Sequence, residues 1–345
     1  MCRKSKSLTG LFWSVVALCL LSACNNGDSS CDQTPENPSV QSMEIIRLDE
    51  QLLNTSSREE VIQLMKDHPG FTRWFLDSDQ YPNLNELAKK LYGISKDAAI
   101  DTLFQETKEV FGNLETLGTE LSSAFSWLKH YYPSATVPKI KIALTGLYND
   151  LYVSDTVIVL GLEYFIGKEA TFRPANTPEY ILKRYEKESI LPLIFSFVSN
   201  DFMAIDTRDN TLLADMINYG RSYYFTKKMM PCKPDGWIVG YTEEEMRLVS
   251  ANQETIWGHF INRELFYETS HFVKNKYTGE RPNVFEIGDQ CPGRIARWLG
   301  WQIVEAYMEQ NPEVSLSDLM VETDAQKILN KSKFKAKNQS ISNHQ

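Results

Sequence analysis

The chain has 345 residues, of which 42% are apolar and 12% aromatic, so it can bury a sizeable core. Its formal net charge is −9 at pH 7, and a negative surface argues against nucleic acid and anionic lipid headgroups as partners. The length exceeds the usual domain of roughly 50–250 residues, so one large domain and two lobes are both open.

The N-terminus has the order of a bacterial export signal. Basic residues precede position 7, and the apolar run Leu11–Leu21 follows. This run is shorter than the roughly 20 residues that cross a bilayer as a helix. The tetrapeptide LSAC, which ends at Cys24, matches the lipobox of lipoproteins. We therefore predict a signal peptide over residues 1–23 and a lipid on Cys24. An ordinary secretory signal followed by a chance cysteine is the alternative.

Residues 24–42 are predicted to be the lipid anchor and a flexible tether, because Asn25–Ser42 is rich in Asn, Asp, Ser and Pro. Of the six cysteines, Cys31, Cys232 and Cys291 remain after signal removal and acylation, so at most one bridge can form. Cys31 lies in the polar tether and is expected to be free. A Cys232–Cys291 bridge and two unpaired thiols are both open.

The body is predicted to begin near Met43, with an extended-to-helical opening and helical patterns up to about His130. Val137–Thr145 then alternates apolar and polar residues with the period of a half-buried strand. A second strand, Thr156–Leu160, is apolar throughout and is expected to be buried on both faces. With Gly146 between them, these strands predict a small antiparallel sheet.

Helical patterns dominate from Pro178 onward. Thr242 and Glu245 form a capping box, Pro292 suits a first turn, and Asn311 precedes the stop at Pro312. Thr323 with Gln326 is read as a further cap. The expected helices are Ile190–Phe202, Leu212–Phe225, Glu243–Phe266, Pro292–Met308 and Ser315–Leu329.

The fold class is therefore α+β, mainly α-helical, with one small β-sheet in the middle of the chain. We expect one domain over residues 43–330, with lobes at 43–135 and 136–330 as an option. Residues 331–345 are expected to be a basic, frayed tail.

Familiar catalytic motifs are missing, including HExxH, and no two of the five histidines are spaced i, i+4. On a helix, Glu264, Glu268 and His271 would share one face, which makes them weak candidates for a divalent metal ion. A solvated polar face is the alternative. Arg294 and Arg297 flank Trp298, which fits either a cation–π groove or a charged edge beside an aromatic core stripe.

The C-terminal half carries a set of blocks that resembles the gliding-motility lipoprotein GldB family of the Bacteroidota. The resemblance extends over essentially the whole mature chain. The most specific block is PGRIARWLGWQIV, with Gly293, Arg294, Trp298, Gly300 and Trp301. The supporting blocks are MEIIRLDEQLL (residues 43–53), GLEYFIG (161–167), NYGR (218–221), MMP (229–231), GYT (240–242), Asn252 with Glu254 and Trp257, SL (315–316), DAQKIL (324–329) and SKFK (332–335). Glu163 stands where an Asp is expected, and Cys291 where a small residue is expected.

The resemblance implies a lipid-anchored protein of the cell envelope, at the outer membrane and facing the periplasm. It implies envelope or motility-machinery proteins as partners, the membrane as the site of the lipid, and no cofactor. The family is also similar to exported zincin-type peptidases, whose HExxH helix supplies two metal ligands. The corresponding helix here, Leu212–Phe225, holds no His or Glu.

The resemblance therefore implies a zincin-like pseudo-peptidase with no catalytic and no metal-binding residues. Tyr219, Arg221 and Glu254 are expected to converge in its vestigial cleft, where an Arg221–Glu254 ion pair could fill the space of the metal. A solvent-facing Arg221 is the alternative. Two functions stay open: a non-catalytic lipoprotein that binds a protein or envelope component, and an exported metallohydrolase or peptidase with an atypical site.

Overall fold

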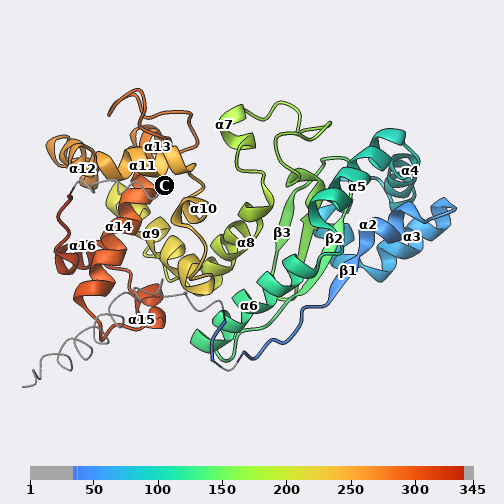
Figure 1. The fold of residues 1–345 in the computed structure, drawn as a ribbon, viewed down its shortest axis with the longest axis horizontal. Coiled ribbons are helices and arrows are strands. Elements are labelled where there is room, and N and C mark those ends of the chain that lie inside the picture. The colour runs from blue at the N-terminus through green and yellow to red at the C-terminus, as the bar shows by residue number, and fades with distance from the viewer. Residues whose placement is uncertain (1–33, 37, 338–345) are drawn as a thin grey trace, which may run out of the picture. The chain divides into compact units, whose positions relative to one another are not determined.

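The computed structural model describes residues 34–36 and 38–337. The predicted signal peptide, Cys24, Cys31 and most of the predicted tether lie outside these residues. The described residues belong to one compact unit. The described part is mainly helical and contains one four-stranded sheet, which confirms the α+β, mainly α class (Figure 1). No helix in the described part is both long and apolar enough to cross a membrane.

The sheet has the strand order β1-β2-β4-β3. β1 (Ile45–Arg47), β2 (Lys139–Ala143) and β4 (Val157–Gly161) run parallel, and only β3 (Leu151–Val153) is antiparallel, at one edge. The predicted antiparallel pairing of the two main strands was wrong. The chain between them first forms the short strand β3 and then turns back, which brings β4 beside β2 in the parallel direction.

Both faces of the sheet are covered. Ile142 of β2 and Leu160 of β4 face the core shared with α6 (Glu115–Tyr131) and α8 (Ile190–Val198). Val159 points the other way and packs with helices nearer the N-terminus, so β4 is buried on both faces as predicted. Those helices are α2 (Leu48–Leu53), α3 (Arg58–Asp67) and α4 (Leu84–Ile94), while α5 (Ala98–Phe111) covers a smaller third cluster.

The second half of the chain packs around α9 (Leu212–Met229) and α14 (Ile295–Gln310). In Figure 1, α8 lies between α9 and β3, and it contacts both. The surrounding helices are α7 (Glu179–Leu182), α10 (Asp235–Val239), α11 (Glu243–Ala251), α12 (Gln253–Asn262), α13 (His271–Thr278), α15 (Leu316–Val321) and α16 (Ala325–Ser332).

Several predicted helix limits need correction. The predicted helix Glu243–Phe266 is broken at Asn252, whose side-chain amide donates to the carbonyl of Leu248 and ends α11. The predicted helix Ser315–Leu329 is two helices, and Asp324 rather than Thr323 caps the second. Pro292 lies before α14, because Arg294 adopts a left-handed conformation with φ of 62°. The capping box of Thr242 is confirmed.

The α9–α14 contact explains the glycine in the C-terminal block. A Cβ atom on Gly300 would lie 1.9 Å from the carbonyl oxygen of Met216, and one on Gly220 would lie 2.4 Å from that of Gly300. Only glycine lets the two backbones approach this closely. Trp298 and Trp301 are buried, and α14 packs mainly on α9 and α16.

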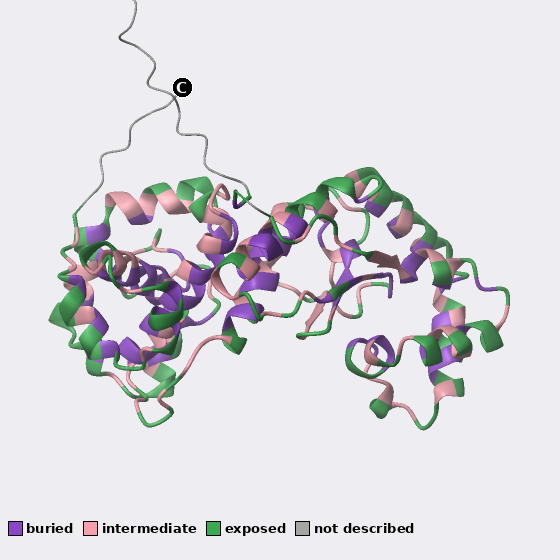
Figure 2. Ribbon diagram, turned by 90° about the horizontal axis from the view of Figure 1, so that it is seen from below, coloured by how far each residue is buried: buried purple, intermediate pink, exposed green. Residues whose placement is uncertain are grey.

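Figure 2 shows the buried residues on the inner sides of the helices and along the sheet. The packed body begins before Met43, because the backbone N–H of Val40 donates to Ser126 of α6. Cys291 is a free thiol, whereas Cys232 is disulfide-bonded. The two therefore do not pair with each other.

Candidate functional site

A cleft of about 620 Å³ runs along one face of α9, and we call it the α9 cleft. Its lining residues come from α8, α9, α10 and the start of α14, and Tyr219 and Ser222 are among those of α9. Segments far apart in the sequence thus meet here. The charged and hydrogen-bonding side chains among its lining residues are Asp150, Arg184, Tyr185, Ser189, Ser196, Asn200, Asp215, Asn218, Tyr219, Ser222, Tyr223, Trp237, Glu280, Arg294 and Arg297.

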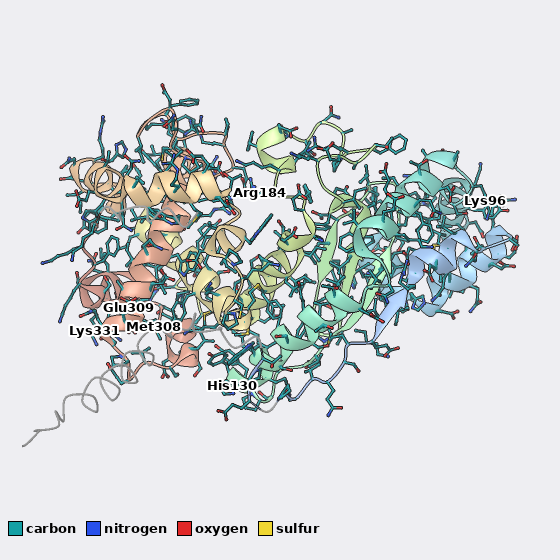
Figure 3. All side chains as sticks on the ribbon, viewed as in Figure 1. Lys96, His130, Arg184, Met308, Glu309 and Lys331 are labelled. Carbon is teal, nitrogen blue, oxygen red and sulfur yellow. The ribbon has the colours of Figure 1, made fainter. Side chains whose placement is uncertain are left out.

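Arginine side chains gather at one end of the cleft around the carboxylate of Glu280. Arg184, which Figure 3 labels, donates through Nη1 to Glu280 Oε1 at 3.0 Å and through Nη2 to the other oxygen. Arg294 lies 3.5 Å from the same carboxylate through Nε and donates to the carbonyl of Gly240 at 2.8 Å. Burial raises the pKa of Glu280, but the arginines outweigh this and lower it overall.

The backbone of the PGR block positions Arg294. A Cβ atom on Gly293 would lie 2.2 Å from the carbonyl oxygen of Arg281, so this position tolerates only glycine. The hydroxyl of Tyr241 donates to the Gly293 carbonyl at 2.7 Å. The Arg294 guanidinium lies 5.5 Å from the ring centroid of Tyr241. These contacts hold Arg294, which is only 8% exposed, at the end of the cleft.

Arg297 forms the next part of this wall. Its Nε donates to the carbonyl of Thr278 at 2.6 Å, and its guanidinium carbon lies 4.2 Å from the ring centroid of Tyr219. Cation–π contacts therefore exist, but they join Arg297 to Tyr219 and Arg294 to Tyr241, while Trp298 belongs to the core. The sequence indicated the arginines and missed their aromatic partners, which come from distant segments.

Asp150, directly before β3, also lines the cleft. The hydroxyl of Tyr185 donates to its carboxylate at 2.7 Å. Phe197 and Ile205 line the cleft with 54% and 52% of their surface exposed, so the cleft also offers apolar contact area. The arrangement therefore combines an arginine cluster, apolar side chains and a carboxylate.

Glu163, in the block GLEYFIG, lies behind this region and is only 1% exposed. Its Oε1 accepts from the backbone N–H of Thr145 at 2.8 Å, and its Oε2 has no hydrogen-bond partner. Burial raises the pKa of Glu163 to about 7, although these hydrogen bonds oppose the rise. Glu163 holds the turn that leads from β2 to Asp150, a role that no sequence pattern indicated.

The three residues predicted to form a vestigial cleft do not converge. Tyr219 lines the α9 cleft, whereas Arg221 points about 200° away around the helix and is only 1% exposed. The Arg221 guanidinium donates to the carbonyls of Met320 at 2.9 Å and Ala204 at 2.9 Å. Glu254 is exposed on α12. The predicted Arg221–Glu254 ion pair was therefore wrong, because the end of α15 supplies the partners of Arg221.

The weak metal candidates do not share a helical face either. Glu264 has a left-handed backbone with φ of 53°, and Glu268 is extended. The carboxylate of Glu268 accepts from the backbone N–H groups of Thr269 and Ser270, just before α13 begins at His271. Among the described residues, no three His, Cys, Asp or Glu side chains are grouped as metal ligands would be.

A family model described as "Gliding motility protein GldB" matches residues 30–336. This range spans the sheet, the α9 cleft and the block around Trp298. No curated protein and no solved structure gives a significant match.

Proposed function

Because the chain belongs to the gliding motility protein GldB family, we propose that it is a lipid-anchored envelope protein that binds a partner protein in the α9 cleft, without catalysis. Family membership makes it a gliding-motility lipoprotein of the cell envelope. The outer membrane, the periplasmic side, the binding role and the absence of catalysis are the parts of this proposal that go beyond the family.

The α9 cleft carries the proposal. In an enzyme with a zincin-type helix, the cleft side of α9 would present metal ligands and a base. Here that side presents Asp215, Asn218, Tyr219, Ser222 and Tyr223, and the Asp215 carboxylate is already paired with Lys274 at 2.8 Å. Ser222 Oγ lies 2.8 Å from Ser199 Oγ, and neither hydroxyl has an adjacent base that would activate a nucleophile. The arginine cluster and exposed apolar side chains suit recognition better than bond cleavage.

The N-terminal signal supports the anchoring part. A cysteine lipidated with several acyl chains holds a protein stably at a membrane, which a single chain does not. The residues that follow Cys24 would link the lipid to the folded body. The body would then be free to bind a protein in the same compartment.

A gliding strain that lacks its own copy of the gene tests the proposal. Complementation with Ile205→Glu or Phe197→Glu places a charge on an exposed side chain of the cleft wall. Both variants should be anchored at normal levels and should fail to restore gliding. Phe272→Glu is the matched control, because Phe272 is 75% exposed and does not line the cleft. Normal gliding with both cleft variants would refute the binding role.

The non-catalytic part has its own test. Purified protein is dialysed against a chelator-free buffer and its metal content is measured. We expect no metal in stoichiometric amount. Retention of one zinc or a related ion per chain would contradict a scaffold without catalysis and favour a hydrolase.

A further inference from the structure

Building on the proposed function, we infer that the α9 cleft binds a peptide segment in which a carboxylate stands next to apolar side chains. Arg297 is the anchor for the carboxylate. The aromatic and aliphatic walls of the cleft receive the neighbouring side chains.

Positive charge exceeds negative charge at the arginine cluster of the cleft. Arg184 and Arg294 share one carboxylate, that of Glu280, and the nearby charge of Arg297 also lowers its pKa. Three guanidinium groups thus face one carboxylate in a chain whose net charge is −9. Asp215, another acid of the cleft, does not neutralise the arginine cluster, since it pairs with Lys274 at 2.8 Å.

Within the described residues, not all hydrogen-bond donors of Arg184 and Arg297 are used. Nε of Arg184 is buried and has no hydrogen-bond partner. Within the described part of the chain, the hydrogen bond that fixes Arg297 uses Nε alone, and its terminal nitrogens are left for a ligand. Stacking on Tyr219 and the bond to Thr278 already order this side chain. Little conformational entropy is therefore lost when the guanidinium binds an anion.

The planar shape of the guanidinium group favours a carboxylate as the bound anion. A guanidinium is a planar fork that matches a carboxylate through two parallel hydrogen bonds. The cluster already holds one carboxylate in this way, because Arg184 uses two nitrogens on the two oxygens of Glu280. A ligand carboxylate would make the same kind of contact with Arg297.

The size and the apolar side chains of the cleft indicate what the rest of the ligand is. A cleft of about 620 Å³ is much larger than one carboxylate and falls in the range of ligand sites, roughly 300–1,000 Å³. Exposed Phe197 and Ile205 would stay in contact with water if only a small anion bound. An acidic residue flanked by apolar ones on a protein chain covers both features.

The test uses the full-length lipidated protein in detergent micelles as the target for a phage-displayed library of short random peptides. We expect enrichment of sequences with Asp, Glu or a free C-terminus beside aromatic or branched aliphatic residues. A selected peptide should bind at least about tenfold more weakly when its acid is replaced by the matching amide. Displacement by inorganic phosphate at concentrations at which acetate has no effect would assign the arginines to phosphate and overturn the inference.

Protein variants give the second readout. Arg297→Gln should lose the preference for the acid over the amide, and Arg297→Lys, which keeps the charge without the fork, should retain part of it. Arg247→Gln is the matched control, since Arg247 is exposed on α11 and pairs with Glu244 outside the cleft. Equal discrimination by wild type and Arg297→Gln would overturn the inference.

The two proposals fail separately. If no acidic peptide is enriched but Ile205→Glu still abolishes gliding, the ligand class is wrong and the binding function stands. If acidic peptides bind through Arg297 but both cleft variants glide normally, the ligand class stands and the proposed function fails.

Discussion

At the scale of single residues, buried charge explains the differences between sequence and structure. Arg221 was expected to face either a cleft or solvent, because an arginine on a helix gives no sequence sign of a third option. Burial lowers its pKa to about 10, and backbone carbonyls from α15 and from Ala204 accept hydrogen bonds from its terminal nitrogens. A charge that is held by backbone carbonyls cannot be recognised from the spacing of acidic residues.

Glu163 gives a prediction at this scale. Its pKa is about 7 in the folded protein, against 4.5 for the free group, so the folded state binds the proton more tightly. This stabilisation is complete below pH 4.5 and is lost as the pH rises to 7, a change of about 3 kcal/mol. The free energy of unfolding of Glu163→Gln minus that of wild type should therefore be more positive at pH 8 than at pH 4.5.

Urea unfolding of both proteins at these two pH values measures the effect. Glu305, whose pKa burial also raises to about 7, contributes the same trend to both proteins and cancels in the difference. Parallel stability curves for wild type and Glu163→Gln would show that Glu163 is not the titrating group.

At the scale of elements, periodicity predicted the existence and type of most helices and of both main strands. The direction of the strands was not predictable from the sequence. Leu151–Val153 is too short to be recognised as a strand by its pattern, and yet its antiparallel pairing with β4 leaves β4 parallel to β2. The helix break at Asn252 was also missed, since the apolar stripe continues across it. The PGR block was recognised as a motif, but its partners Tyr219 and Glu280 lie on other elements.

The α9–α14 contact supplies a prediction for elements. Gly300→Ala should destabilise the protein, because its Cβ would meet the Met216 carbonyl, which the helix backbone holds in place. We expect a loss of several kcal/mol or failure to fold, measured by thermal unfolding. Gly258→Ala is the control inside α12, where a Cβ meets nothing within 4 Å and the gain in helix propensity should stabilise by up to about 1 kcal/mol. Equal melting temperatures for the two variants would refute the close packing.

At the scale of the whole molecule, the proposed function combines a lipid anchor, a helical body and the α9 cleft. The family match covers residues 30–336 and thus the body. The lipid anchor was predictable from the sequence, because the residues that direct lipidation form one short, contiguous motif. The cleft needs long-range packing of α8, α9, α10 and α14, so the sequence indicated only Tyr219, Arg294 and Arg297 among its residues, and not that they meet.

The anchor gives the prediction at this scale. Cys24→Ser should prevent acylation, because a hydroxyl does not accept the thioether-linked lipid. The variant should accumulate as an uncleaved precursor and be lost from the membrane fraction, which fractionation and intact-mass measurement would reveal. Normal anchoring of this variant would contradict the lipoprotein assignment.

Site-specific photo-crosslinking in gliding cells tests the central claim, that the α9 cleft holds a partner protein, most directly. A photoreactive amino acid is placed at Ile205 on the cleft wall or at Phe272 outside it, and both positions are exposed. The account predicts one discrete crosslinked species from Ile205, none of the same size from Phe272, and its loss when Arg297→Gln is added. The same species from both positions, or an Ile205 crosslink unchanged by Arg297→Gln, would contradict it.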